Sequence, residues 1–185
     1  MPFGASWGVT EAEKALPFPC DERCPSPDLA LFRGVTVSAP APVLFRWLCQ
    51  LRVAPYSYDW LDNLGRRSPR TLTPGLDLLA PGQRVMTIFD LVAFEPGRSL
   101  TIVNRARGGA RNAFGEVWVS YVIRPGEGKA NRLLAKLLVR CPRGLAGLLL
   151  RGMLPAGDLV MMRRQLLNLK SLAERDAARP DHPAG

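Results

Sequence analysis

One run of ten residues holds the side chains of this sequence that are best suited to chemistry. It carries aromatic rings at alternate positions, on Tyr56, Tyr58 and Trp60. Two carboxylates, those of Asp59 and Asp62, lie among the rings. Such rings combine a large contact area with one polar handle each, which suits a site for a flat or greasy organic molecule. The run therefore predicts the mouth of a pocket, and the alternative is a core-edge cluster whose polar tips reach water.

A carboxylate inside an aromatic pocket is the first candidate for acid or base chemistry. Desolvation by the rings raises the pKa of a carboxylate, so Asp59 would become able to move protons in an aldol or dehydration step. The other candidates are Asp62, Tyr56, Tyr58 and the more distant Tyr121. The alternative is that both aspartates cap turns or pair with the two arginines that follow.

Motifs of the common cofactor-dependent and nucleophilic enzymes are absent from the sequence. It contains no Gly-x-Ser-x-Gly elbow, no Walker loop and no dinucleotide fingerprint. The only histidine, His182, lies in a Pro-flanked tail, so a metal clip at Cys20 and Cys24 would lack further ligands. The four cysteines match no disulfide framework of small secreted domains, which favours reduced thiols. We expect no metal and no nucleotide cofactor.

Length and charge are those of one domain with a basic second part. At 185 residues the chain can bury a core without metals or disulfides. The net charge of +9 is uneven, at −2 for residues 1–62 and +11 for residues 63–185. Such a field attracts nucleic acid, acidic lipid headgroups or anionic substrates. Because the basic residues are dispersed, we expect no specific nucleic-acid binding, and at most peripheral contact with an anionic membrane. The N-terminus has no signal-peptide pattern, which favours a bacterial, cytoplasmic setting.

Prolines, turn signals and the spacing of hydrophobic residues predict the order of helices and strands. Residues 1–30 are rich in proline and predict an extended leader, with one helical turn at 10–16 that carries a capping-box spacing. A strand is expected at 31–38 and a helix at 43–51. Short turn signals then separate strands that must pair as antiparallel hairpins, at residues 84–94 (with a bend), 99–107, 116–124 and 131–140.

Alternation predicts which face of each strand is buried. In the last strand Leu133, Ala135, Leu137 and Val139 form the inner set. In the second, Asn104 falls on the inner face, where it orients a ligand carbonyl or bonds the backbone. For the third strand two inner sets are open, and the one that contains Tyr121, with Val119 and Ile123, is preferred over Trp118, Ser120 and Val122.

The last part of the chain predicts two helices. Glycines make residues 143–154 a short or irregular helix, Pro155 breaks it, and Asp158 caps a longer helix that runs to about residue 178. A stripe that includes Met162 and Leu166 is expected to pack on the concave sheet face; its other members are Leu159, Leu169 and Ala173. Charged residues and Pro155 interrupt the apolar stretch 144–162 before the roughly 20 residues that a membrane span requires.

Four segments of this pattern resemble bacterial members of the START-like (SRPBCC) superfamily, which includes polyketide cyclases/dehydrases and lipid carriers. They are residues 34–42, 56–65, 94–100 and 154–161, and the resemblance spans about residues 7–175. It implies an α+β helix-grip fold, in which a curved antiparallel β-sheet wraps around a long C-terminal helix and encloses a cavity. The expected domain is 31–178, between an extended leader, 1–30, and a disordered tail, 179–185.

The resemblance implies a cavity for a hydrophobic or aromatic small molecule, but it fixes no single chemistry. One hypothesis adds polyketide cyclase or dehydratase activity, with Asp59, Asp62 and Tyr58 as the catalytic residues and no cofactor. The alternative is a peripheral lipid-binding or transfer protein that uses its basic surface on anionic membranes, and a third is an interaction module without a cavity. The expected ligand contacts are Tyr56, Tyr58, Trp60, Asn104, Tyr121, Met162 and Leu166.

Overall fold

The computed structural model describes residues 4–58, 60, 65–104 and 115–179. Within these residues a seven-stranded sheet has the order β1-β2-β7-β6-β5-β4-β3. Every neighbouring pair is antiparallel except β1 with β2. The elements are β1 (Ser6–Trp7), α1 (Glu11–Lys14), β2 (Leu29–Val37), α2 (Ala41–Cys49), η1 (Gln50–Arg52), β3 (Arg84–Val85), β4 (Phe89–Glu95), β5 (Ser99–Asn104), β6 (Glu116–Pro125), β7 (Asn131–Arg140) and α5 (Leu145–Ala177).

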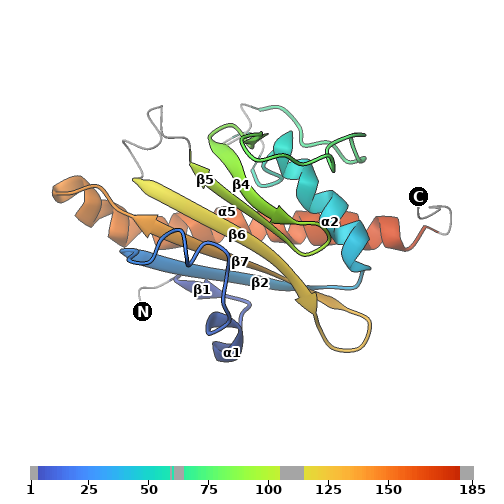
Figure 1. Cartoon of the computed structure of the whole chain (residues 1–185), viewed down its shortest axis with the longest axis horizontal. Coiled ribbons are helices and arrows are strands. Elements are labelled where there is room, and N and C mark those ends of the chain that lie inside the picture. Colours follow the sequence, from blue (N-terminus) through green and yellow to red (C-terminus); the bar gives the residue numbers. More distant parts are fainter. Residues whose placement is uncertain (1–3, 59, 61–64, 105–114, 180–185) are drawn as a thin grey trace.

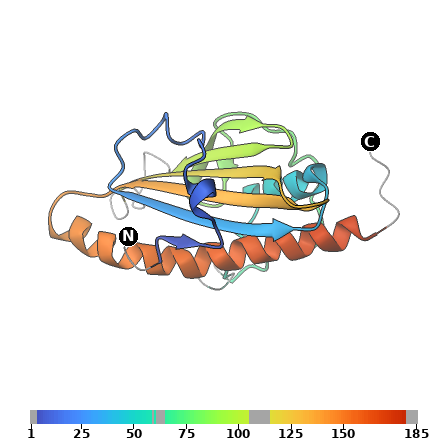
Figure 2. The same cartoon turned by 90° about the horizontal axis from the view of Figure 1, so that it is seen from below.

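The molecule has three layers (Figures 1 and 2). Helix α5 runs along one face of the sheet, α2 lies beside it on the same face, and the leader crosses the opposite face. The indole nitrogen of Trp47 on α2 donates to the Asp176 carboxylate on α5 at 3.0 Å, which fixes one helix against the other. The expected α+β architecture, a curved antiparallel sheet around a long C-terminal helix, is confirmed.

The strand registers follow the alternation of the sequence. The inner set of β7 is buried in the core that α2 and α5 share with the sheet, and so is the preferred inner set of β6, Val119, Tyr121 and Ile123. The opposite faces of these strands, with Val122, pack in a separate cluster under Phe18 of the leader. Both expectations about the inner face are therefore confirmed.

The first helical turn shows that strictly local signals also hold. Thr10 Oγ1 accepts from the Glu13 backbone N–H at 3.1 Å, and the Glu13 carboxylate accepts from the Thr10 N–H at 2.8 Å. These two bonds are the reciprocal capping box that the sequence predicts. Arg132 of β7 holds the same carboxylate at 2.6 Å, so the turn is attached to the sheet.

The expected break at Pro155 is wrong. Helix α5 is continuous over 33 residues, with a buried Pro155 in its interior. Its carbonyl oxygen accepts from Arg33 at 3.3 Å, and this contact with β2 helps hold the helix on the sheet across the proline. Gly147 does not loosen the helix but allows a close approach, since a Cβ there would lie 1.8 Å from the Pro142 carbonyl oxygen. Asp158 is accordingly inside a helix and does not cap one.

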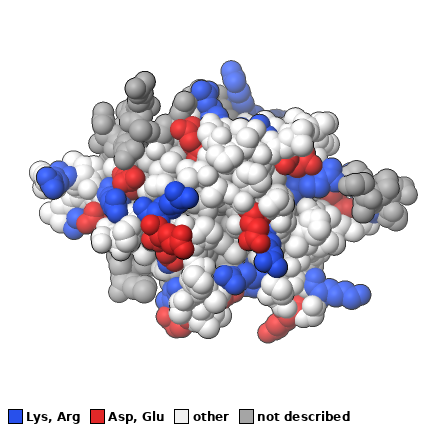
Figure 3. Space-filling view, viewed as in Figure 1, with Lys and Arg blue, Asp and Glu red and all other residues white. Residues whose placement is uncertain are grey.

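Charges of both signs are interleaved on the face opposite α5. Figure 3 shows Lys and Arg next to Asp and Glu over the strands and the leader. Ion pairs also tie charged residues together, such as Lys136 with Asp21 at 2.6 Å. Among the described residues, basic side chains therefore form no continuous patch on the face in this view.

Candidate functional site

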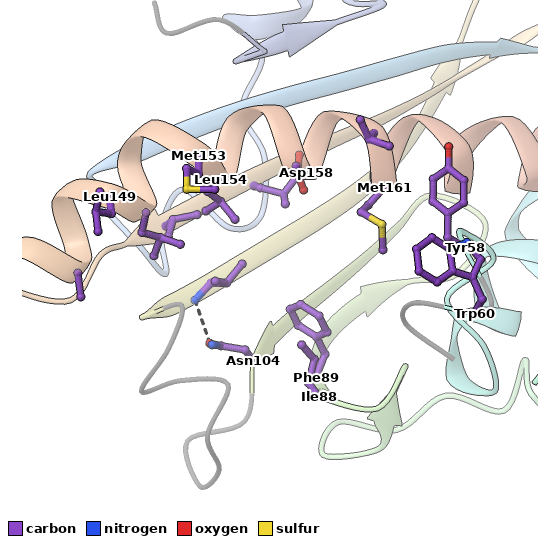
Figure 4. A pocket seen from close by; sticks show the side chains of 17 residues that line it. Tyr58, Trp60, Ile88, Phe89, Asn104, Leu149, Met153, Leu154, Asp158 and Met161 are labelled. Atoms are coloured by element: carbon purple, nitrogen blue, oxygen red, sulfur yellow. Dashed lines mark hydrogen bonds between the residues drawn. The ribbon is translucent and has the colours of Figure 1, made fainter. Parts of the chain in front are cut away.

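A deep groove lies between the first half of α5 and the adjacent strands (Figure 4). Its volume is about 970 Å³, at the upper end of the range for small-molecule sites. Side chains of α5 form one wall, the inner faces of β6 and β7 form the floor, and Ile88 and Phe89 form part of the other wall. The lining is Tyr58, Trp60, Ile88, Phe89, Asn104, Val117, Leu137, Val139, Ala146, Leu149, Leu150, Met153, Leu154, Gly157, Asp158, Val160 and Met161.

Asp158 is the one acidic residue among the described residues that line the groove. Its Oδ2 accepts from Arg33 Nη2 at 2.7 Å, and 9% of its side chain is exposed. The Arg33 side chain is fully buried and also donates to the carbonyls of Ala5, Phe32 and Pro155. The second oxygen of Asp158, Oδ1, accepts no hydrogen bond from the described residues.

Burial dominates the electrostatics of this pair. It raises the pKa of Asp158 to about 6, against the opposing effect of the Arg33 charge and hydrogen bond. Burial also lowers the pKa of Arg33, with Asp158 acting in the other direction. Each group thus keeps the other charged in a place where either alone would be strongly disfavoured.

Asn104 lines the groove, but the backbone occupies its amide. Its Nδ2 donates to the Gly115 carbonyl at 2.7 Å, and its Oδ1 accepts from the Val117 N–H at 2.9 Å. These bonds join the end of β5 to the start of β6 across residues 105–114. Of its two expected roles, the structure shows the bond to the backbone.

Tyr121 lies in the core, below the groove. Its hydroxyl donates to Gln165 Oε1 at 2.7 Å and contacts Met162 sulfur at 3.8 Å. Gln165 in turn donates to the Pro55 carbonyl at 2.7 Å, so this polar chain is internally satisfied. Burial raises the pKa of Tyr121 far above its usual range. Neither Tyr121, Met162 nor Leu166 lines the groove, and all three are buried in the core.

The aromatic run divides between core and groove. Tyr56 is buried, with its ring edge-on to Trp47 at 6.1 Å between centroids, and it does not line the groove. Tyr58 and Trp60 do line it, at the end away from Leu149, and Trp60 is 74% exposed (Figure 4). Asp59 and Asp62 lie outside the described residues.

The described residues contain no group of three or more His, Cys, Asp or Glu side chains placed to hold a metal ion. Cys20 and Cys24 are free thiols, buried in the cluster under the leader, where desolvation raises the pKa of both. Both thiols are packed among the hydrophobic side chains of that cluster.

Comparisons with known proteins found solved structures that have a similar fold. Neither a protein-family model nor a curated protein matches the sequence. A protein from Thermobifida fusca matches with a TM-score of 0.54 and 15% identity, over 83% of this chain and 99% of that one. A protein from Mesorhizobium loti matches with a TM-score of 0.51 and 17% identity, over 79% and 97%. The di-domain ARO/CYC StfQ from the steffimycin biosynthetic pathway gives 0.51 and 13%, over 86% of this chain and 55% of that one.

This chain has the helix-grip fold. The likeness to START-like structures is thereby confirmed at the level of the fold, which identities this low support without extending to activity. In this helix-grip domain the groove occupies the side of α5 that faces the sheet, along the first half of the helix.

The first half of the grip helix is unusually exposed. Leu145, Leu148, Leu149 and Met153 are each 58–73% exposed. By length and composition alone α5 is apolar enough to cross a membrane, with an 18-residue window of mean hydropathy 1.4 that is 17% buried. Its second half, by contrast, is anchored in the domain core through Met162, Leu166, Leu169 and Ala173. Of these exposed residues, Leu149 and Met153 line the groove, and the four together form an apolar rim on this half of the helix.

Sequence reasoning missed Asp158, Arg33 and most of the apolar groove wall. Two signals were available. Arg33 falls at the inward positions of its strand, between Leu31 and Val35, where an unpaired charge is strongly disfavoured. Asp158 is the single acid in the apolar first half of the helix. Together they predict a buried pair between the two elements.

Proposed function

We propose that this protein binds a hydrophobic small molecule in the groove between α5 and the sheet. The observation that supports it is the groove, about 970 Å³ lined almost entirely by apolar side chains. A site of this size and lining suits an elongated or flat apolar molecule. The polar atoms of Asn104 are already bonded, so the apolar walls supply most of the binding free energy. A cytoplasmic setting is part of the proposal.

Two tryptophan substitutions on the same helix test this proposal. Met161→Trp adds bulk to a groove wall, whereas Ser171→Trp adds the same ring at an exposed position outside the groove. Binding of the neutral fluorophore N-phenyl-1-naphthylamine should weaken at least about tenfold in Met161→Trp, because the added ring occupies ligand volume. The Ser171 variant should bind like the parent protein. Equal affinity in both variants, with unchanged melting temperatures, would exclude the groove as the site.

Native mass spectrometry of protein from its own host addresses the ligand directly. A co-purified apolar molecule, absent from the Met161→Trp variant purified in parallel, is the expected result. A molecule retained equally by both variants would place the binding site elsewhere.

Acid or base chemistry of the cyclase or dehydratase type is a second candidate function. It is favoured by the Tyr58 hydroxyl on the groove wall and by the fold likeness to ARO/CYC StfQ. Tyr58 at the groove, with Asp59 and Asp62, remains the proposed catalytic set. Enzyme-dependent deuterium exchange at the α-carbon of 4-phenylbutan-2-one, followed by NMR, tests it. Exchange that survives Asp59→Asn, Asp62→Asn and Tyr58→Phe would rule this set out.

Peripheral lipid handling is the alternative that the exposed rim favours. Leu145, Leu148 and Met153 present apolar surface on the half of α5 that lines the groove, as expected for a helix that touches a membrane interface. Flotation with phosphatidylcholine vesicles, with and without phosphatidylglycerol, measures it. Leu148→Ser should reduce flotation if the rim inserts, and unchanged flotation would argue against this surface.

A further inference from the structure

We infer that Asp158 selects among apolar ligands for those that carry a neutral hydroxyl group, whose proton its free Oδ1 accepts. This inference rests on the proposed function, because it assigns a head-group contact inside the same groove. It names Asp158 as a specificity-determining residue and Arg33 as the residue that positions it.

The placement of the two charges sets the direction of the selection. Arg33 is fully buried behind Asp158, and its terminal nitrogens are engaged by three carbonyls and by the carboxylate. The guanidinium therefore cannot reach an anionic head group in the groove. Of the pair, only Asp158 lines the groove, and a carboxylate is an acceptor with no donor when ionised.

An anionic head group would lose its hydration on entering the groove and would find only an acceptor at Asp158, because the Arg33 donors are already engaged. An alkylammonium group would meet a carboxylate that Arg33 already neutralises, and would lose its own hydration on entering an apolar groove. A hydroxyl group loses much less on transfer and regains one hydrogen bond to a charged acceptor. The geometry thus favours the neutral donor over both ions.

The other polar side chains of the described lining are less well placed for this role, since Tyr58 and Trp60 lie at the end of the groove beyond Met161 (Figure 4). The Asn104 amide is committed at both ends to the backbone, and the Tyr121 hydroxyl lies in the core on Gln165. Phe89 and Met161 face the same space with apolar atoms (Figure 4). A ligand would then place its chain along the apolar walls and its hydroxyl group at Asp158.

The test is a matched ligand series with a constant chain length. Decan-1-ol, 1-methoxydecane, decylamine and decanoate would each displace N-phenyl-1-naphthylamine from the full-length protein at pH 8. Decan-1-ol should bind at least about tenfold more tightly than its methyl ether, the ratio expected for one hydrogen bond to a charged acceptor. Both ions should bind more weakly than the alcohol.

Variants separate the head-group contact from folding and from the groove itself. Arg33→Met combined with Asp158→Leu removes both charges together, so no buried ion is left alone. It should bind the ether as the parent protein does and lose the preference for the alcohol. The control Ser171→Trp, at an exposed position of α5 outside the groove, leaves the pair untouched and should keep that preference.

A direct readout covers the case in which the double variant fails to fold. With 13C-labelled aspartate, the Asp158 carboxyl resonance of the parent protein should shift on adding decan-1-ol and stay in place with the ether. Decanoate as the tightest ligand, equal affinity across the series, or a preference that survives in the double variant would each overturn the inference. Failure of all four ligands and of the fluorophore to bind would instead refute the proposed function.

Discussion

Arg33→Met breaks the buried pair from the strand side and leaves the Asp158 carboxylate behind. The two charged groups are 2.7 Å apart, and only 9% of the Asp158 side chain reaches solvent. At that distance Coulomb attraction is about 6 kcal/mol for an effective dielectric constant of about 20. Desolvation offsets much of this attraction in the intact pair, so its net contribution to stability is small.

The substitution removes the attraction but not the desolvation of Asp158. We therefore expect Arg33→Met to lower the free energy of unfolding by about 3–5 kcal/mol, the range for breaking a buried pair on one side. Three carbonyl oxygens, on Ala5, Phe32 and Pro155, also lose a donor. Against a total stability of about 5–15 kcal/mol, this is a large fraction.

Urea unfolding at pH 8, followed by circular dichroism, measures this loss with Asp158 ionised in the parent protein. The double variant Arg33→Met/Asp158→Leu should lie within about 2 kcal/mol of the parent, because two apolar side chains replace two opposite charges. Asp158→Leu alone should be as unstable as Arg33→Met. A loss below about 1 kcal/mol in Arg33→Met, with an unchanged m-value, would refute the reasoning, as would a double variant whose loss equals the sum of the singles.

Three further substitutions or conditions test the core, the helix and the titration of the site. Leu166→Ala truncates a fully buried side chain and should lower the unfolding free energy by about 2–5 kcal/mol, while Leu148→Ala, at 66% exposure, should change it by less than about 0.5 kcal/mol. Gly147→Ala places a Cβ 1.8 Å from a loop carbonyl oxygen and should lower the unfolding free energy by about 1–3 kcal/mol. Gly152→Ala, with nothing within 4 Å of the added Cβ, should raise it by about 0.5–1 kcal/mol. Chemical denaturation compares the two variants, and equal effects would contradict the close approach at Gly147. Burial raises the pKa of Asp158 to about 6 from 3.8, so the folded state holds more protons between these values and the stability contributed by this group should fall as pH rises from about 4 to 6. Unfolding midpoints across this range should show that fall relative to the double variant, and parallel curves would contradict it.

The sequence predicted best those parts of the fold that depend on the local spacing of hydrophobic residues. Leu133, Leu137 and Val139 alternate with Lys136 and Arg140, so only one register of the last strand buries the apolar set. The strand boundaries and hairpins follow from turn signals in the same way. These features depend on neighbours within a few residues, which a sequence displays directly.

The break at Pro155 was mispredicted because the interactions that keep the helix intact are distant in sequence. A proline removes one helical hydrogen bond and usually ends or kinks the helix. Here Arg33, more than 120 residues earlier, donates to the Pro155 carbonyl and pairs with Asp158 one turn later. Nothing in residues 143–158 shows that partner, so local propensity gave the wrong answer.

The site was predicted in part for the same reason. Tyr58 and Trp60 belong to a run whose aromatic residues are evident from the sequence alone, and both line the groove. The one acidic residue of the described groove lining is Asp158, whose role depends on Arg33 in a strand 125 residues away. An interpretation that searched inward strand positions for a charge, and apolar helices for an isolated acid, would have paired Arg33 with Asp158.

The Arg33–Asp158 pair also bears on whether the groove only binds a ligand or also catalyses a reaction on it. A carboxylate that abstracts a proton gains by being basic, and the Arg33 cation opposes the rise in pKa that burial gives Asp158. A carboxylate that accepts a hydrogen bond from a ligand gains by staying ionised and fixed in place, and Arg33 provides both conditions. Asn104 is committed to the backbone, and Tyr58 lies at the end of the groove beyond Met161, so neither is positioned beside Asp158 for a second proton transfer. The arrangement at Asp158 therefore favours recognition of a polar head group on an apolar molecule over catalysis by this carboxylate.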